Sequence, residues 1–255
     1  DINIKILGVT ATPYRLNNVG FRGIFEQLIV SKSIFRFIKD NELVGFRHFA
    51  TTTPDLSRVR FIKGINDYDL DELSKCMSSE KIMSDIIESY HNYGQGKQSI
   101  LFSVDQNHSR EIVARFKKDG INAEFIDSKT RKEIRKDILI RFKNKEIKVL
   151  VNVKIFTEGF DCPDISVVQL VRPTKSLSFY LQMVGRCLRK SEGKNHAIII
   201  DNAGLWKTHG LITKDITWTL DGVTINNTNV ARKVNGNEVI EEPYDRIKEI
   251  AGLEM

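Results

Sequence analysis

Two arginines and a glutamine near residue 185 have the types and spacing to act together on an anion. They lie in the segment Gln182-Met183-Val184-Gly185-Arg186-Cys187-Leu188-Arg189. Gln182, Arg186 and Arg189 follow one another at i, i+4 and i+7, so on a helix they share one face. A planar, permanently charged guanidinium matches phosphate oxygens well. A basic surface helix without a ligand is the alternative, and this segment alone favours neither interpretation.

A helix with an apolar stripe is the element that would position these side chains. The stripe recurs at helical spacing and is formed by Leu177, Leu181, Val184 and Leu188. At about 100° per residue it lies roughly 130° from the charged face. Gly185 costs a helix interior about 1 kcal/mol relative to alanine, and close approach of a backbone or a ligand is one reason for a glycine there.

Polar segments follow the predicted strands, at the point where each strand ends. In an open α/β sheet, ligands bind beyond the carboxyl ends of the strands. The segments are Thr10-Ala11-Thr12-Pro13, Asp105-Gln106-Asn107-His108-Ser109, Thr157-Glu158-Gly159-Phe160-Asp161-Cys162-Pro163 and Arg172-Pro173-Thr174-Lys175-Ser176. Gly159 and Asp161 suit a loop whose backbone approaches a phosphate while a carboxylate takes a sugar hydroxyl. Gly-x-Asp is also common in ordinary turns.

Strands and helices alternate along the chain, which predicts an α/β fold. Several strands are continuous apolar runs, typical of a parallel sheet with helices on both faces. Strands are predicted at 4–9, 41–49, 100–104, 123–126, 149–153, 167–171 and 197–200. Helices are predicted within 21–39 and 70–93, at 109–119, and at 130–142 after a capping box at Thr130 and Glu133. Residues 205–255 lose the pattern and are predicted to be a C-terminal extension, packed back through Trp206, Trp218 and Tyr244.

Composition places the chain among globular proteins. It has 255 residues, 41% hydrophobic and 28% charged, which fits one large domain or two small ones. The net charge of +6 suits a polyanionic partner. Cys76, Cys162 and Cys187 are far apart, so neither zinc nor a disulfide framework is indicated, and a reducing, cytoplasmic setting is expected. Apolar runs are too short for a membrane span. The start at Asp1, directly before a strand-like segment, indicates a chain that begins inside a domain.

Two short segments imitate a nucleotide-binding motif without meeting its requirements. A Walker A loop follows a strand and ends in Gly-Lys-Ser/Thr. The segment Gly94-Gln95-Gly96-Lys97-Gln98-Ser99 precedes a strand and has Gln98 in place of the hydroxyl residue. The second segment, Asp71-Glu72-Leu73-Ser74, imitates the acidic motif that binds magnesium. It lies in a polar helical stretch, with no apolar strand before it. The chain is therefore expected to contain no phosphate cradle, no magnesium carboxylate and no metal site.

The order of the strand-end segments resembles the superfamily 2 helicases and translocases. Thr10–Pro13 is similar to their motif III, Ile100–Ser109 to motif IV, Val149–Pro163 to motif V and Gln182–Arg189 to motif VI, and the resemblance covers nearly all of residues 1–204. Within the superfamily, the chain looks most like RadD-like bacterial DNA repair helicases and their phage relatives. The supporting stretches are 67–73, 172–177, 201–204 and 218–222. The cysteine cluster that tends to follow this core in RadD-like proteins does not occur.

The resemblance implies two RecA-like lobes with ATP and Mg²⁺ in the cleft between them. Residues 1–50 would be the end of the first lobe with the crossover, 51–94 a linker and helical segment, 95–204 the C-terminal RecA-like domain, and 205–255 the extension. By this resemblance, Arg186 and Arg189 are arginine fingers on the γ-phosphate. The other roles it implies are ATP contacts by Gly159 and Asp161, a link to lobe one by Gln182, and coupling of hydrolysis to lobe movement by Thr10 and Thr12. The Mg²⁺ ligands would belong to the missing N-terminal lobe.

The resemblance also implies a nucleic-acid strand across the same edge of the sheet. The candidate phosphate contacts are Ser103, Asn107, His108 and Thr157, with help from backbone N–H groups at the helix start. Residues 129–148 carry nine basic and three acidic residues, which could form an electrostatic track, although a solvated amphipathic helix is the preferred interpretation. Single-stranded or duplex DNA is the expected partner, and RNA stays open.

Three functions remain compatible with the sequence. The leading one is the C-terminal part of an ATP-dependent DNA helicase or translocase in DNA repair or processing, inactive as an ATPase by itself. The second is a duplex-DNA translocase subunit of a restriction-type system. The third is a non-enzymatic nucleic-acid-binding module that lacks a motor lobe.

Overall fold

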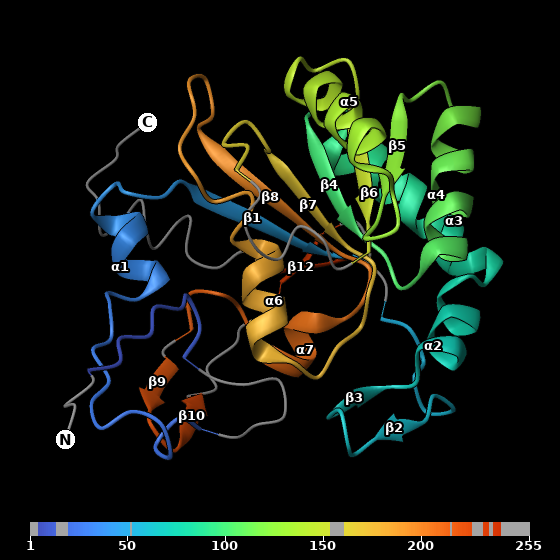
Figure 1. The fold of residues 1–255 in the computed structure, drawn as a ribbon. Coiled ribbons are helices and arrows are strands. Elements are labelled where there is room, and N and C mark those ends of the chain that lie inside the picture. Colours follow the sequence, from blue (N-terminus) through green and yellow to red (C-terminus); the bar gives the residue numbers. More distant parts are fainter. Residues whose placement is uncertain are drawn as a thin grey trace.

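The computed structural model of the protein describes residues 5–13, 20–51, 53–153, 161–214, 216–225, 232–234 and 237–240, the last two ranges by their backbone (Figure 1). The helices are α1 (Ile34–Lys39), α2 (Leu70–Met77), α3 (Glu80–Ser89), a π-helical turn η1 (Tyr90–Gly94), α4 (Gln106–Lys118), α5 (Lys132–Lys143), α6 (Leu177–Val184) and α7 (Leu205–His209).

One large sheet organises the described part of the chain. Its strands are β1 (Gly45–Ala50), β4 (Ser99–Phe102), β5 (Ala123–Ile126), β6 (Val149–Asn152), β7 (Val167–Leu170), β8 (His196–Asp201), β11 (Arg232–Val234) and β12 (Asn237–Ile240), in the order β11-β12-β1-β8-β7-β4-β6-β5. The six strands from β1 to β5 in that order are mutually parallel, and β12 and β11 extend the sheet antiparallel. Two small hairpins complete the set, β2 (Phe61–Ile62) with β3 (Asp67–Tyr68) and β9 (Ile216–Thr219) with β10 (Gly222–Ile225).

Helices cover both faces of this sheet, as the continuous apolar strands predicted. Alternate residues of β4 show the two layers, since Ile100 and Phe102 pack with α5 and α6 while Leu101 packs with α2, α3 and α4. Figure 1 shows α6 and α7 on one side of the strands and α3 and α4 at the opposite edge. The prediction of a parallel α/β sheet is confirmed.

The start of α5 is not capped as predicted, whereas α4 has a side-chain cap. Asp105 caps α4 by accepting from His108 N at 2.8 Å. The capping box predicted at Thr130 does not form, because the Thr130 hydroxyl donates to Asp127 Oδ1 at 2.8 Å and accepts from Asp127 N at 2.9 Å. Thr130 thereby closes the turn between β5 and α5 instead of capping the helix.

Of the two elements predicted near the start of the chain, the strand is wrong and the helical stretch is confirmed only in its second part. Residues 5–9 form no strand, and Leu7 and Val9 are 89% and 92% exposed. An isolated segment has no ladder partner for its backbone groups, so an apolar sequence alone does not make it a strand. The predicted helix at 21–39 is reduced to α1, which begins at Ser33 as its N-cap.

Segments on both sides of the predicted boundaries at residues 50 and 94 pack together in the described part of the chain. β1 pairs in parallel with β8 along its whole length, so it belongs to the main sheet. α2, α3 and η1 contribute Leu73, Ile86 and Tyr90 to the same core as Leu101 of β4. The extension beyond residue 204 returns to the sheet, because β12 pairs with β1. Tyr244 lies outside the described residues. Among the helices in the described ranges, none is long and apolar enough to cross a membrane.

Candidate functional site

The arginine segment begins as a helix and ends as a series of turns. α6 ends at Val184 with Gly185 as its C-cap, so the predicted helix through Arg189 is wrong in its second half. The chain continues in tighter turns, with Arg186 N bonding Met183 O at 3.3 Å and Cys187 N bonding Val184 O at 3.2 Å. A Cβ at Gly185 would meet Leu181 O at 3.1 Å, and among described residues no foreign backbone crowds it. α6 ends at Gly185, whose φ of −54° lies in the right-handed region open to any residue, so this helix end does not require a glycine.

The predicted apolar stripe is confirmed despite the shorter helix. Leu177, Leu181, Val184 and Leu188 are all buried in the core. Gln182, Arg186 and Arg189 are each partly exposed, on the side away from that stripe. Val44 N donates to Leu188 O at 2.9 Å, which fixes the turn after the helix against the start of β1. The charged residues are thus presented on a rigid base.

The start of α6 is held by a carboxylate from a distant hairpin. Asp67 of β3 accepts from the Thr174 hydroxyl at 2.9 Å and from Lys175 N at 3.0 Å. Ser176 then caps the helix by accepting from Phe179 N at 3.2 Å. Both ends of α6 are therefore fixed by contacts from outside the helix.

Arg189 and Asp161, two residues predicted to contact one nucleotide, form an ion pair. Arg189 Nη1 donates to Asp161 Oδ1, and the two side chains are 41% and 73% exposed. An ion pair this exposed contributes about 0–1 kcal/mol, so an incoming phosphate could displace the carboxylate. The structure thus brings together the end of the predicted motif V and the end of motif VI. Gly159 and Thr157 lie outside the described residues.

Three further residues join the same two segments and were missed from the sequence. The Ser191 hydroxyl donates to Asp164 Oδ1. Lys194 Nζ donates to Pro163 O at 2.9 Å, Ile165 O at 2.6 Å and Arg189 O at 2.8 Å. The sequence signal for Lys194 is its place directly after Gly193. A glycine can adopt the positive φ of a sharp turn, and Gly193 has a φ of +73°.

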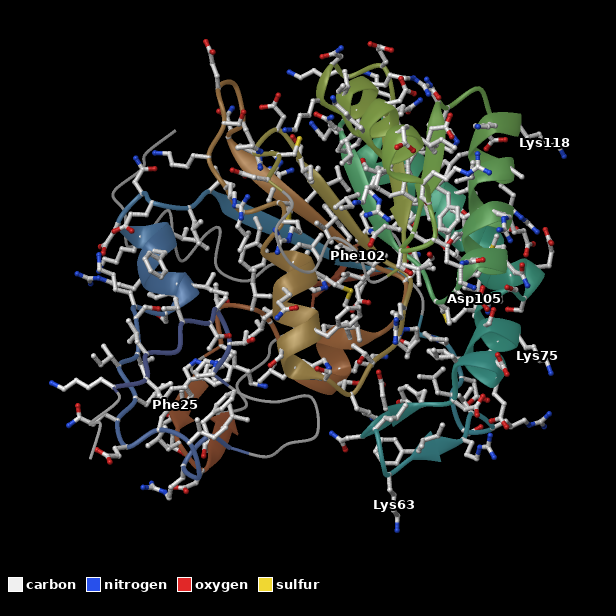
Figure 2. The ribbon with its side chains drawn as sticks, in the orientation of Figure 1. Phe25, Lys63, Lys75, Phe102, Asp105 and Lys118 are labelled. Carbon is white, nitrogen blue, oxygen red and sulfur yellow. The ribbon has the colours of Figure 1, made fainter. Side chains whose placement is uncertain are left out.

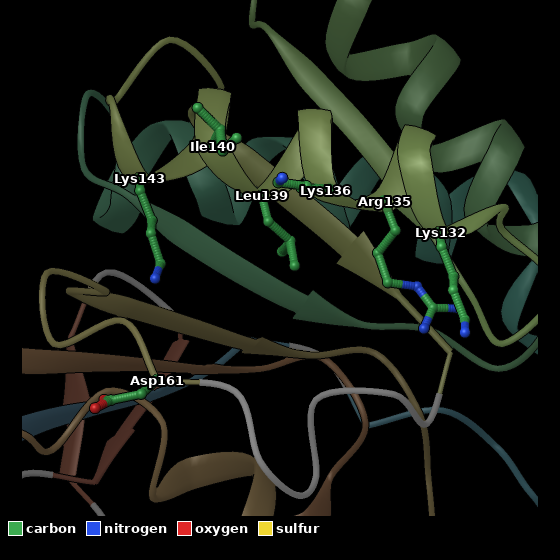
Figure 3. Close-up of a pocket in the computed structure, with 7 residues that line it drawn as sticks. All are labelled: Lys132, Arg135, Lys136, Leu139, Ile140, Lys143 and Asp161. Atoms are coloured by element: carbon green, nitrogen blue, oxygen red, sulfur yellow. The ribbon is translucent and has the colours of Figure 1, made fainter.

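A basic hollow of about 490 Å³ separates α5 from the segment that carries Asp161. Figure 3 shows the side chains of Lys132, Arg135 and Lys143 extending from α5 into this space, with Asp161 on its far side. Lys136 also lines the hollow. Arg135 is partly used for structure, since its Nη2 donates to Asp127 O at 2.8 Å. The three lysines are exposed.

The residues after β4 are divided between the surface and the interior. Asn107 is exposed in the first turn of α4, next to Asp105, which Figure 2 shows at the start of that helix. Ser103 is buried, and its hydroxyl hydrogen-bonds the Ser109 hydroxyl at 2.6 Å and Asn152 O at 3.1 Å. His108, predicted to contact a phosphate, is fully buried, and burial lowers its pKa to about 4. Neither buried side chain presents a surface to a phosphate in this conformation.

The two threonines of the predicted coupling segment form a local turn. Thr10 Oγ1 accepts from Thr12 N at 3.2 Å and lies 3.2 Å from Thr12 O. Thr12 is buried, whereas Thr10 is exposed.

The described residues contain no group of three or more His, Cys, Asp or Glu side chains that could hold a metal ion. Burial raises the pKa of the Cys187 thiol to about 12, so it is an uncharged core side chain at neutral pH.

Six parallel strands with helices on both faces, and polar segments at their carboxyl edge, define a RecA-like α/β lobe. Residues 79–191 match the family model described as the helicase conserved C-terminal domain. A fragment of a "putative HsdR subunit of a type I restriction enzyme" from Vibrio vulnificus has a similar structure. Its TM-score is 0.59 and its identity 25%, over 78% of this chain and 39% of that one.

Two curated relatives extend the match over most of the chain. A "51.5 kDa protein" of a Lactococcus phage is 34% identical over 216 residues, which are 85% of this chain and 47% of the relative. "Putative ATP-dependent helicase IRC3" of Saccharomyces cerevisiae is 34% identical over 208 residues, which are 80% of this chain and 30% of the relative. The chain carries a superfamily 2 helicase C-terminal domain, as the motif order predicted, and it spans less than half the length of these relatives.

Proposed function

We propose that this chain is the second RecA-like lobe of an ATP-dependent DNA helicase or translocase. Its part is to supply Arg186 and Arg189 to the phosphates of ATP that is held mainly by a first lobe. The observation that carries the proposal is the meeting of Arg189 with Asp161 at an exposed edge, beside Arg186 in the preceding turn. The name of the yeast relative supports the dependence on ATP.

The residues of this edge fit a nucleoside triphosphate. Two guanidiniums suit the equatorial oxygens of a transferring phosphoryl group, and a carboxylate suits a ribose hydroxyl. In ATP the α- and β-phosphates separate the ribose from the γ-phosphate, so Asp161 and Arg189 would have to move apart when both engage it. The segments that carry them stay joined through their backbones while the side chains change partners. Carboxylates of the first lobe would hold Mg²⁺, and the ion would neutralise part of the charge of the phosphates.

Nucleic acid would lie along the carboxyl edge of the sheet and over α5. Asn107 and the first turn of α4 offer an exposed amide and a helix N-terminus to a phosphate. The hollow beneath α5 adds three exposed lysines, which favours the electrostatic track over a purely solvated helix. Ser103 and His108 are buried beneath this edge and would support its conformation without contacting the nucleic acid.

Exposed apolar side chains at residues 6–9 and 24–30 support a partner lobe. Ile6 is 68% exposed and Ile29 is 93% exposed, while the sheet buries its own apolar residues almost completely. A surface of this kind normally packs against another domain. Thr10 directly follows the first of these stretches and would then be at the junction between the lobes. At that position it could couple ATP hydrolysis to lobe movement.

A duplex-DNA translocase is the second candidate function. The structural likeness to the HsdR fragment favours it, because that protein is named as a putative subunit of a type I restriction enzyme. A helicase that unwinds DNA in repair or processing, suggested by the RadD-like sequence features, stays the first candidate. A strand-displacement assay on the protein with both lobes separates them, since a translocase without unwinding activity hydrolyses ATP but releases no strand.

ATP hydrolysis by this chain alone and with its first lobe tests the proposal. The chain alone should show background turnover with or without DNA, and the two-lobe protein should show DNA-stimulated turnover. Clear DNA-stimulated hydrolysis by residues 1–255 alone would overturn the two-lobe assignment. A two-lobe protein that binds DNA but never hydrolyses ATP would favour the non-enzymatic module.

A further inference from the structure

Lys194 joins the two segments that carry the candidate nucleotide contacts. Its ammonium donates to Pro163 O at 2.9 Å, Ile165 O at 2.6 Å and Arg189 O at 2.8 Å. An ammonium group has three N–H donors, so these three carbonyls use its full capacity. Two of the carbonyls follow Asp161, and the third belongs to Arg189 itself.

The surroundings of Lys194 show that its ammonium group is held by backbone carbonyls at a partly buried position. Burial lowers the pKa of Lys194, so the ammonium is held at some desolvation cost. The charged and titratable groups around it are Cys162, Asp164, Cys187 and Arg189. Asp164 is already engaged by the Ser191 hydroxyl and lies 3.3 Å from Lys145 Nζ. The ammonium is therefore satisfied by backbone carbonyls and does not serve as a simple ion-pair partner.

We infer that Lys194 is a positioning residue for the arginine finger. By fixing the Arg189 carbonyl to the chain just after Asp161, it sets where the guanidinium emerges relative to the carboxylate. Lys194 itself touches neither side chain's charged end. This role rests on the proposed ATP site and adds to it a residue outside the predicted motifs. Displacement of a catalytic group by about 1 Å can reduce a rate by about 100-fold, so loss of the tether should be felt in turnover.

The first test uses three variants of the two-lobe protein. Lys194→Met keeps the length of the side chain and removes its donors, and Lys194→Arg keeps the charge. Lys190→Met is the matched control, because Lys190 Nζ donates to one carbonyl, Asn41 O at 3.0 Å, from the same turn. DNA-stimulated kcat should fall about 10- to 100-fold in Lys194→Met, with KM for ATP changed less than about threefold. Lys194→Arg should recover part of the loss, and Lys190→Met should match the parent protein.

A double-mutant cycle distinguishes positioning of Arg189 from general support of the fold. If Lys194 acts through Arg189, Lys194→Met should cost little further turnover in an Arg189→Ala background. Fully additive losses, or normal kcat in Lys194→Met, would overturn the inference.

Hydrogen exchange gives a readout that does not depend on hydrolysis. In Lys194→Met, the Ile165 amide, which bonds Cys162 O at 3.2 Å, should exchange about tenfold faster or more, with the central strand β4 unchanged. Unchanged exchange at Ile165 would overturn the tether even if the parent protein had no ATPase. Absence of ATPase in the parent would count against the proposed function alone.

Discussion

Arg189 donates to Asp161, a residue 28 positions earlier in the chain, across the gap between two segments that follow different strands. The contact neutralises a candidate arginine finger with a candidate ribose ligand. Both side chains are exposed, so the pair is available to a third group. ATP that engages both would have to break this pair, and the following predictions start from that exchange of partners.

Asp161→Ala should remove discrimination against nucleotides that lack ribose hydroxyls. A hydrogen bond from a hydroxyl to a carboxylate contributes about 1.5–3 kcal/mol, or about 10- to 150-fold in kcat/KM. The parent two-lobe protein should therefore prefer ATP over 2′,3′-dideoxy-ATP by that margin, and the variant should treat them nearly alike. Steady-state hydrolysis of the two nucleotides measures this ratio.

Asp137→Ala is the control for that experiment. Asp137 lies on α5 and contacts Arg141 at 3.5 Å, away from the ion pair. It should leave the preference unchanged. Full discrimination in Asp161→Ala would show that the carboxylate does not contact the ribose.

The three exposed lysines of α5 should contribute to DNA affinity through charge alone. Changing Lys132, Lys136 and Lys143 to Gln should lower affinity for all sequences and reduce the slope of log K against log salt by about 2 to 3. Fluorescence anisotropy over a salt series measures the slope. The control changes Lys75, Lys81 and Lys118, which are exposed on the helices of the opposite face. Equal slopes in both triple variants would contradict a DNA contact by α5 and favour the interpretation of α5 as a solvated surface helix.

His108 should make the fold sensitive to mild acid. Burial lowers its pKa to about 4, below the usual 6.5, so between these values the unfolded chain binds a proton that the folded chain does not. Stability is therefore complete above about pH 6.5 and falls as the pH drops, by about 2 kcal/mol between pH 6.5 and pH 5.

Urea unfolding at pH 7 and pH 5 tests the role of His108. His108→Gln should lose about 2 kcal/mol less than the parent chain over this interval. His91→Gln, at a half-exposed histidine of η1 on the same face of the sheet, should lose as much stability as the parent. The same acid loss in His108→Gln and the parent would contradict the buried neutral state.

Local patterns in the sequence were enough to predict the central sheet. β4, β6, β7 and β8 are short apolar runs that are buried on both faces, and such runs identify parallel strands without knowledge of their partners. β1 could not be assigned in the same way. Its partner β8 is about 150 residues away in the chain, so its membership in the sheet depends on a contact that periodicity does not encode.

The arginine site was only partly predictable for a similar reason. The spacing of Gln182, Arg186 and Arg189 correctly places them away from the apolar stripe, although the helix ends at Val184. A glycine such as Gly185 can indicate close packing within a helix or the end of a helix. α6 does end at this residue, but its φ of −54° does not require a glycine. Lys194 escaped notice because its partners are backbone carbonyls, which have no residue type to recognise.

Replacement of the two arginines tests the central claim most directly. In the two-lobe protein, Arg186→Ala and Arg189→Ala should each reduce DNA-stimulated ATP turnover by about 10³-fold, because an arginine finger acts on charge that develops in the transition state. Affinity for DNA should stay within about threefold of the parent, and Lys190→Ala should leave both properties unchanged. Near-normal ATP turnover in both arginine variants would contradict the assignment of this segment to an ATP site.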